Sequence, residues 1–141
     1  MINNSMLQHF EHKHHEHLSE NEIYDAYKIF FGTMVSESRL KIINLLRKGK
    51  KNVSEITDEL KMNQTAVSHD LARLKKCGFV NAEINGKFRY YKLNKETIKP
   101  LIELIDKHMS LYCIHILNGK SKIFNHSPML GQMKGGKNVI K

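Results

Sequence analysis

The chain has 141 residues, and its 23 Lys and Arg outnumber its 14 Asp and Glu to give a formal net charge of +9. With 40% hydrophobic residues, it can bury one modest core rather than build a deep catalytic cleft. No apolar run approaches the roughly 18 residues of a membrane span, and the polar N-terminus lacks a signal-peptide core. We therefore expect a cytoplasmic protein, and its charge implies a polyanion as partner, either nucleic acid or an anionic membrane surface. The order of the predicted elements, given below, favours DNA and no membrane partner.

The charge is distributed unevenly along the chain. Residues 1–25 hold five acidic residues and one Lys, whereas residues 36–93 hold 13 Lys and Arg against six Asp and Glu. Residues 118–141 add five Lys and no acid. The middle and the C-terminal segments are therefore predicted to attract the anion. Cys77 and Cys113 are the only cysteines, too few for a disulfide framework.

Helical patterns follow one another from the N-terminal side. Residues 1–18 are predicted to be a flexible, His-rich arm. Residues 20–34 place apolar side chains at helical spacing and predict a first helix. Ser36 is a suitable N-cap for a second helix, which Gly49 helps to end. A short third helix is expected over residues 53–61. Asn63 can then cap a fourth helix over residues 64–77.

The pattern changes from helix to strand after Gly78. The runs VNAEI and KFRYYKL flank Asn85-Gly86, a pair typical of a type I′ hairpin turn. A last helix is expected over residues 97–118, with Pro100 in its first turn, and residues 119–141 are predicted to form a disordered basic tail. The order predicts a winged helix-turn-helix in residues 19–118: mainly α (α+β), with about five helices and a two-stranded wing.

The predicted fourth helix has the composition of a DNA-reading helix. Val67, Leu71 and Leu74 fall on one side of it and are expected to face the core. Short polar side chains near the start of the opposite side can reach base edges, and cations near its end can hold phosphates. The candidate DNA-binding residues here are Asn63, Gln64, Thr65, Ser68, His69, Arg73 and Lys76. The alternative is that these side chains only solvate an exposed helix.

The predicted hairpin is a candidate second contact with DNA. Lys87, Arg89 and Lys92 are expected at or near its tip, and Lys87 and Arg89 are the candidate DNA-binding residues. Cationic wings of this kind lie over the minor groove or the flanking phosphates. The alternative is an edge strand that its charges protect from aggregation.

Three stretches resemble the ArsR/SmtB family of winged-helix transcriptional repressors: SESRLKIINLL, VSEITDELKMNQTAVSHDLARLKKCGFV and INGKFRYYKL. The resemblance implies a homodimer built from the first and last helices, a palindromic operator, and release from it when an effector binds. The apolar faces of residues 20–34 and 97–118 agree with such a dimer. Asp70 departs from the pattern, because many members carry His there. We expect Arg73 to neutralise it.

Many members of this family sense metals, so the candidate ligands need separate consideration. No Cys pair lies near residues 53–55, and Asp106-Lys107-His108 falls out of register with the family's pattern for the last helix. The remaining candidate metal ligands are His9, His12, His14, His15, His17, His108, Cys113 and His115. Imidazole suits Zn, Ni or Co, so a transition metal is a possible effector, with no metal needed for folding. Alternatively the arm is a solvated tail, and the last two histidines are a polar pair in a dimer interface.

Three functions remain open from the sequence. The first is a homodimeric DNA-binding repressor that a transition metal releases from its operator. The second is the same repressor with a thiol-redox or protein trigger, and the third is a metal-buffering protein that uses the His-rich arm. No enzyme is expected, because the chain has no nucleophile–base signature and no phosphate-binding Gly loop.

Overall fold

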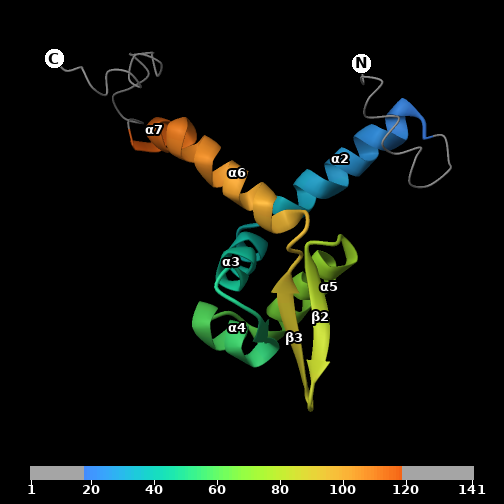
Figure 1. The fold of residues 1–141 in the computed structure, drawn as a ribbon, viewed down its shortest axis with the longest axis vertical. Coiled ribbons are helices and arrows are strands. Elements are labelled where there is room, and N and C mark those ends of the chain that lie inside the picture. The colour runs from blue at the N-terminus through green and yellow to red at the C-terminus, as the bar shows by residue number, and fades with distance from the viewer. Residues whose placement is uncertain (1–17, 119–141) are drawn as a thin grey trace. The chain divides into compact units, whose positions relative to one another are not determined.

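The computed structural model describes residues 18–118. Their elements are α2 (Glu20–Met34), α3 (Glu37–Leu46), β1 (Lys51–Asn52), α4 (Val53–Leu60), α5 (Gln64–Lys76), β2 (Val80–Asn85), β3 (Phe88–Leu93), α6 (Ile98–Leu111) and α7 (Cys113–Asn118) (Figure 1). The predicted winged helix-turn-helix is confirmed. The predicted tail and residues 1–17 of the predicted arm lie outside the described residues. The chain divides into two compact units, one ending at Asn94 and the other beginning at Lys95.

The first unit has its core where α3, α4, α5 and the sheet meet. The predicted stripe of α5 is confirmed, because Val67, Leu71 and Leu74 are fully buried. Phe79, which follows α5, is also fully buried, and its ring stacks on Phe30 of α2 with 5.1 Å between centroids. This packing fixes one side of α5 and leaves its other side toward solvent.

Polar caps set where the helices of the first unit begin. The Oγ of Ser36 accepts from the backbone N–H of Arg39 at the start of α3. The Oδ1 of Asn63 accepts from the N–H of Ala66 at 3.1 Å, as predicted for the start of α5. Lys61 ends α4 in the left-handed conformation with φ 55°. These caps produce the tight turn that separates the two helices of the motif.

The sheet differs from the predicted two-stranded wing. Its strand order is β1-β3-β2, because Lys51 and Asn52 pair with Tyr91 and Tyr90 of β3. A strand of two residues shows no alternation of polar and apolar side chains, so the sequence did not reveal it. Because β1 belongs to the connection between α3 and α4, its pairing with β3 attaches that connection to the wing.

The hairpin turn also lies one residue later than predicted. Asn85 pairs with Phe88, so the two central residues of the turn are Gly86 and Lys87. Gly86 has φ 68°, whereas Asn85 and Lys87 do not adopt positive φ. A positive φ at the first central residue alone is the pattern of a type II′ turn rather than type I′.

The second unit contains the last helical segment, which was expected to be continuous. Pro100 stands in the first turn of α6, as predicted, but Tyr112 leaves the helical conformation with φ −126° and ψ −65° and separates α6 from α7. No Gly or Pro marks this break, so apolar periodicity alone could not locate it. Within residues 18–118, no helix is long and apolar enough to cross a membrane.

Candidate nucleic-acid interface

The outer face of α5 carries the residues predicted to read bases. Thr65, Ser68 and His69 are exposed, as are Gln64 and Lys76. They stand opposite the buried stripe of this helix, so its packing against α3 and α4 leaves them accessible. Asn63 is exposed as well, but its side-chain oxygen already serves as the cap of α5. The backbone N–H groups at the start of α5 favour an anion such as phosphate.

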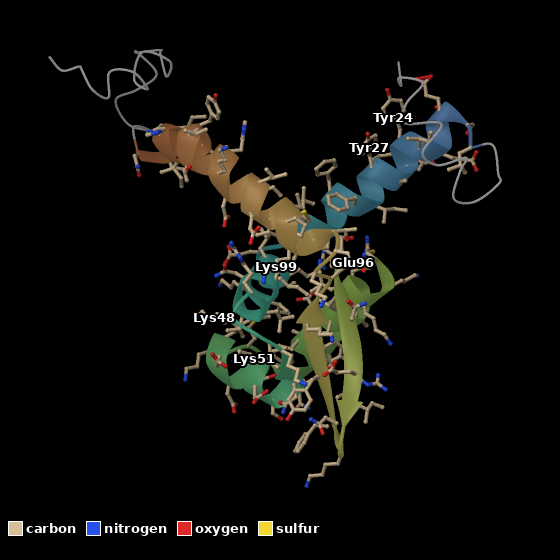
Figure 2. All side chains as sticks on the ribbon, in the orientation of Figure 1. Tyr24, Tyr27, Lys48, Lys51, Glu96 and Lys99 are labelled. Atoms are coloured by element: carbon tan, nitrogen blue, oxygen red, sulfur yellow. The ribbon has the colours of Figure 1, made fainter. Side chains whose placement is uncertain are left out.

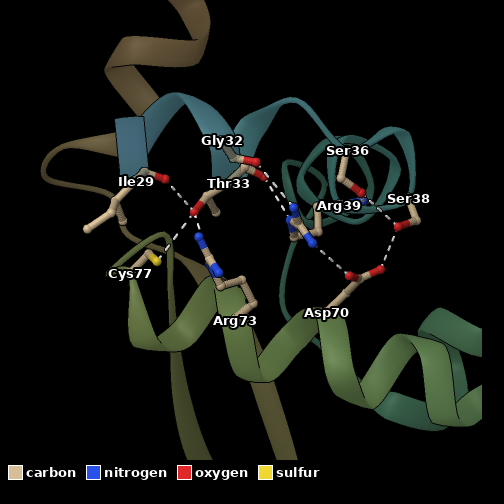
Figure 3. Close-up of polar contacts among 9 residues, drawn as sticks. All are labelled: Ile29, Gly32, Thr33, Ser36, Ser38, Arg39, Asp70, Arg73 and Cys77. Carbon is tan, nitrogen blue, oxygen red and sulfur yellow. Dashed lines mark hydrogen bonds and ion pairs between the residues drawn. The ribbon is translucent and has the colours of Figure 1, made fainter. Parts of the chain in front are cut away.

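The expected pairing of Asp70 with Arg73 is wrong. Asp70 is buried, and its Oδ1 lies 3.2 Å from Nη1 of Arg39 on α3, while its Oδ2 accepts a hydrogen bond from Ser38 Oγ at 2.6 Å (Figure 3). The side chain of Asp70 points from α5 toward Arg39 and Ser38 of α3, whereas Arg73 donates to Thr33 of α2 instead (Figure 3). These buried contacts give Asp70 a structural role, because they join α5 to α3.

Arg73 was expected to pair with Asp70 on its own helix, but it contacts α2 instead. Its Nε donates to the hydroxyl of Thr33, a fully buried residue of α2, at 3.1 Å. The same hydroxyl donates to the carbonyl of Ile29 at 2.8 Å and lies 3.4 Å from the sulfur of Cys77. Arg73 therefore uses one donor inside the protein, although the residue as a whole is exposed. Cys77 itself is half-buried.

The cations of the wing fall into two groups. Lys87 and Arg89 are exposed, and within residues 18–118 neither forms an ion pair; the Lys87 ammonium lies 5.4 Å from the centre of the Phe88 ring. Lys92 was expected near the tip, but it pairs with Asn81 near the base of the hairpin. Its Nζ lies 2.8 Å from the carboxylate of Glu83.

Glu83 binds a second lysine from the neighbouring loop. The Nζ of Lys50 lies 2.7 Å from the other oxygen of the carboxylate. Lys50 and Lys92 together lower the pKa of Glu83 to about 2, mainly through their hydrogen bonds, and Glu83 in turn raises the pKa of Lys50. These two lysines are therefore partly neutralised, whereas Lys87 and Arg89 keep their full charge for an external anion.

Sequence reasoning missed several residues of this surface. The wing exposes Phe88 at 44% and Ile84 at 71%, next to its turn. Lys48 and Lys51 flank the loop between α3 and α4 (Figure 2), and Lys51 forms an ion pair with Glu59 at 2.7 Å. The cationic run over residues 47–51 was the available signal for this part of the surface.

An exposed aromatic row lies along α2. Tyr24, Tyr27 and Phe31 are 44%, 41% and 59% exposed, and successive ring centroids are 6.3 Å apart. Tyr24 and Tyr27 stand on the part of α2 farthest from α3 (Figure 2). Phe30, by contrast, packs on Phe79 in the core. Three exposed aromatic side chains in a row favour a protein partner over water.

The described residues do not assemble the predicted metal ligands. Within residues 18–118, no three His, Cys, Asp or Glu side chains are placed to hold one ion. The centre of the His108 ring instead lies 4.8 Å from that of Tyr112. Cys113, the first residue of α7, is exposed, and His115 of the same helix is exposed too. The five histidines of the arm, from His9 to His17, lie outside the described residues.

Comparisons with known proteins agree with this architecture. Residues 36–82 match the model of the bacterial regulatory protein, arsR family. An uncharacterised HTH-type transcriptional regulator of Methanocaldococcus jannaschii is 36% identical over 61% of this chain and 98% of that protein. The transcriptional activator HlyU of Vibrio cholerae is 32% identical over 60% of this chain and 76% of that protein.

A solved structure extends the likeness to the fold. The homodimeric winged helix-turn-helix DNA-binding domain of Mb0332 from Mycobacterium bovis has a TM-score of 0.63 and 27% identity, over 70% of this chain and 93% of that one. Other matching proteins are named for resistance to arsenicals, mercury or cadmium. The fold, the matched segment and these relatives lead to one conclusion: the chain belongs to the ArsR family of helix-turn-helix transcriptional regulators.

Proposed function

We propose that this regulator is a homodimeric repressor that reads a palindromic operator with α5 and holds the flanking phosphates with its wing. The observation that carries the proposal is the two-sided character of α5, a buried apolar stripe opposite an exposed row of short polar side chains. On the wing, Lys87 and Arg89 supply exposed charge that forms no ion pair within residues 18–118. In this proposal residues 19–118 are the DNA-binding and dimerisation domain.

Base reading is assigned to Thr65, Ser68 and His69. Replacing all three by Ala should abolish operator preference while nonspecific binding stays near wild type, because each base contact removed is worth about 1–3 kcal/mol. Gln64 and Lys76 are assigned to phosphates, together with the remaining donors of Asn63 and Arg73. Operator preference is measured as the ratio of the affinities for operator and for scrambled duplex at one fixed salt concentration. A triple variant that keeps full discrimination contradicts the assignment.

The homodimer is assigned to the aromatic row of α2 and to the last helical segment. Exposed aromatic area of this kind suits the same row on a second copy about a two-fold axis. Two-fold symmetry places the operator half-sites about 34–36 Å apart, one helical turn of DNA. Phe31→Glu should yield monomers at micromolar protein in sedimentation experiments. Phe30→Glu is the unsuitable variant, because it disrupts the core contact with Phe79.

A transition metal, Zn, Ni or Co, is proposed as the trigger for release, held by the five histidines of the arm. Support comes from the density of imidazoles, five between His9 and His17, and from relatives named for metal or metalloid resistance. Recruitment of His108, Cys113 or His115 completes the proposed ligand set.

The test of the trigger compares the full chain with a chain lacking residues 1–18. Both should bind the operator equally in metal-free buffer, but only the full chain should dissociate when the metal is added. Equal release from both chains excludes the arm as the sensor. Release by an oxidant instead, lost in Cys77→Ser, favours the thiol trigger. Metal binding without any change in DNA affinity favours metal buffering.

A further inference from the structure

Two arginines join the C-terminal end of α2 to the proposed reading helix. Arg39 of α3 donates through Nε to the carbonyl of Thr33 at 2.8 Å and through Nη2 to the carbonyl of Gly32 at 3.3 Å (Figure 3). These carbonyls belong to the last turn of α2, where no intrahelical N–H reaches them. The third donor of Arg39, Nη1, meets Asp70 of α5 at 3.2 Å. One guanidinium therefore contacts two helices at once.

Asp70 is held from a second side as well. Its other oxygen accepts from Ser38 Oγ, which in turn lies 3.0 Å from Ser36 Oγ at the cap of α3. Both carboxylate oxygens are thus engaged, and the side chain of Asp70 is only 10% exposed. Three residues further along α5, Arg73 makes its separate contact with the hydroxyl of Thr33. Two links along α5 therefore reach α2, one through Arg39 and one directly.

Such a buried polar connection has a different consequence from apolar packing. A buried ion pair gains little stability over an apolar replacement, because both charges lose water. It does restrict geometry, since the planar guanidinium must meet its acceptors in fixed directions. Apolar side chains at the same place would tolerate rotation of α5 against α2. The connection therefore determines the angle between these helices more than it determines whether the chain folds.

We propose that Arg39 and Asp70 are positioning residues that hold α5 at a fixed angle to α2 and so determine which spacing of operator half-sites the dimer accepts. The inference rests on the proposed function, in which α2 pairs with its copy about the two-fold axis. A rotation of α5 relative to α2 then moves the two reading helices in opposite senses. The dimer therefore binds a DNA duplex in which the two half-sites lie at one particular spacing.

The loss of affinity expected for a changed half-site spacing follows from the geometry of DNA. One inserted base pair moves a half-site by about 3.4 Å along the duplex and turns it by about 35°. A dimer with rigidly held reading helices cannot keep base contacts at both half-sites, so wild-type affinity should fall about 10-fold or more for one inserted or deleted pair. Asp70→Asn removes the charge that holds Arg39 and should reduce this penalty to about threefold or less.

The experiment measures operator affinity over a series of half-site spacings, one and two base pairs shorter and longer than the natural one. The variants are Asp70→Asn and Arg39→Lys, the second of which keeps the charge but cannot reach three acceptors in the fork geometry. Glu37→Gln is the matched control, because it breaks an exposed ion pair with Lys41 on the same α3. Wild type and control should prefer one spacing, and both variants should show a flattened series.

Affinity for an isolated half-site separates positioning from a general loss of structure. It should stay within about twofold of wild type in both variants, because the reading face itself is unchanged. A spacing series as steep as that of wild type in variants that bind as dimers overturns the inference. If Asp70→Asn does not fold, the spacing series is measured with Arg39→Lys and Ser38→Ala instead. Ser38→Ala removes only one hydrogen bond to Asp70. Wild-type protein that is monomeric or does not bind the operator refutes the proposed function instead.

Discussion

The division of the wing cations into two groups can be tested through salt dependence. Lys87 lies in the hairpin turn and Arg89 close to it, and neither forms an ion pair among the described residues, whereas Lys92 on the same hairpin is held by Glu83 at 2.8 Å. Replacement of Lys87 and Arg89 by Ala together should therefore remove phosphate contacts. Replacement of Lys92 by Ala should remove a charge that Glu83 already compensates, which makes it the matched control.

The magnitude follows from counterion release. Each phosphate that a cation neutralises contributes about 0.9 to the slope of log affinity against log salt, so removing two cations from each protomer of a dimer flattens the slope by about 3.6. Between 50 and 200 mM salt, wild-type affinity should then fall about 150-fold more than that of the Lys87/Arg89 double variant. The Lys92→Ala variant should follow the wild-type slope closely.

Fluorescence anisotropy with operator and scrambled duplexes over this salt range measures both slopes. The loss should be the same for the two duplexes, because phosphates carry no sequence information. An unchanged slope in the double variant means that the wing does not touch the DNA backbone. Equal flattening by Lys92→Ala means that Glu83 does not withdraw that lysine from DNA, and the division into two groups is then wrong.

Three further variants test the first unit. Glu83→Gln should steepen the salt slope, because it frees Lys50 and Lys92. Since Glu83 has its pKa lowered from 4.5 to about 2, its stabilisation is present above pH 4.5 and lost toward pH 2, so acid unfolding curves of this variant should lack that component. In urea denaturation, Phe79→Ala should cost about 3–5 kcal/mol because its ring is fully buried. Asn63→Ala should cost about 1 kcal/mol because the cap of α5 is removed.

The sequence determined much of the fold because its signals were local. Ser36 and Asn63 are caps whose hydrogen bonds span three residues, and the stripe of Val67, Leu71 and Leu74 repeats with the helical period. Such signals require no knowledge of what packs against them. The order of elements, which identifies the winged helix-turn-helix, could therefore be predicted from the chain alone.

The parts that the sequence did not predict depend on contacts between distant residues. Asp70 and Arg39 are 31 positions apart, so helical spacing pointed to Arg73, which is near in sequence but donates to Thr33 instead. Glu83 and Lys50 meet only because β1 joins the sheet. Lys92 lay near the tip by residue count but near the base by strand register. Each correction reflects tertiary pairing that overrides a local interpretation.

The register of the hairpin provides a last test, because the predicted and observed turns differ in which residues need positive φ. A type I′ turn at Asn85-Gly86 requires positive φ at both residues, whereas the structure has it at Gly86 alone, with φ 68°. Gly86→Ala should therefore destabilise the chain by about 1–2 kcal/mol. The cost is conformational strain, since an added Cβ meets no atom within 4 Å. Gly86→Asn should cost less, because Asn tolerates this conformation better.

Asn85→Ala is the variant that discriminates between the two registers. It should change stability by less than about 0.5 kcal/mol, as expected for an exposed strand residue. Urea denaturation of the three variants decides the register. A loss of stability in Asn85→Ala as large as that in Gly86→Ala restores the type I′ turn and moves Lys87 out of the turn into the strand.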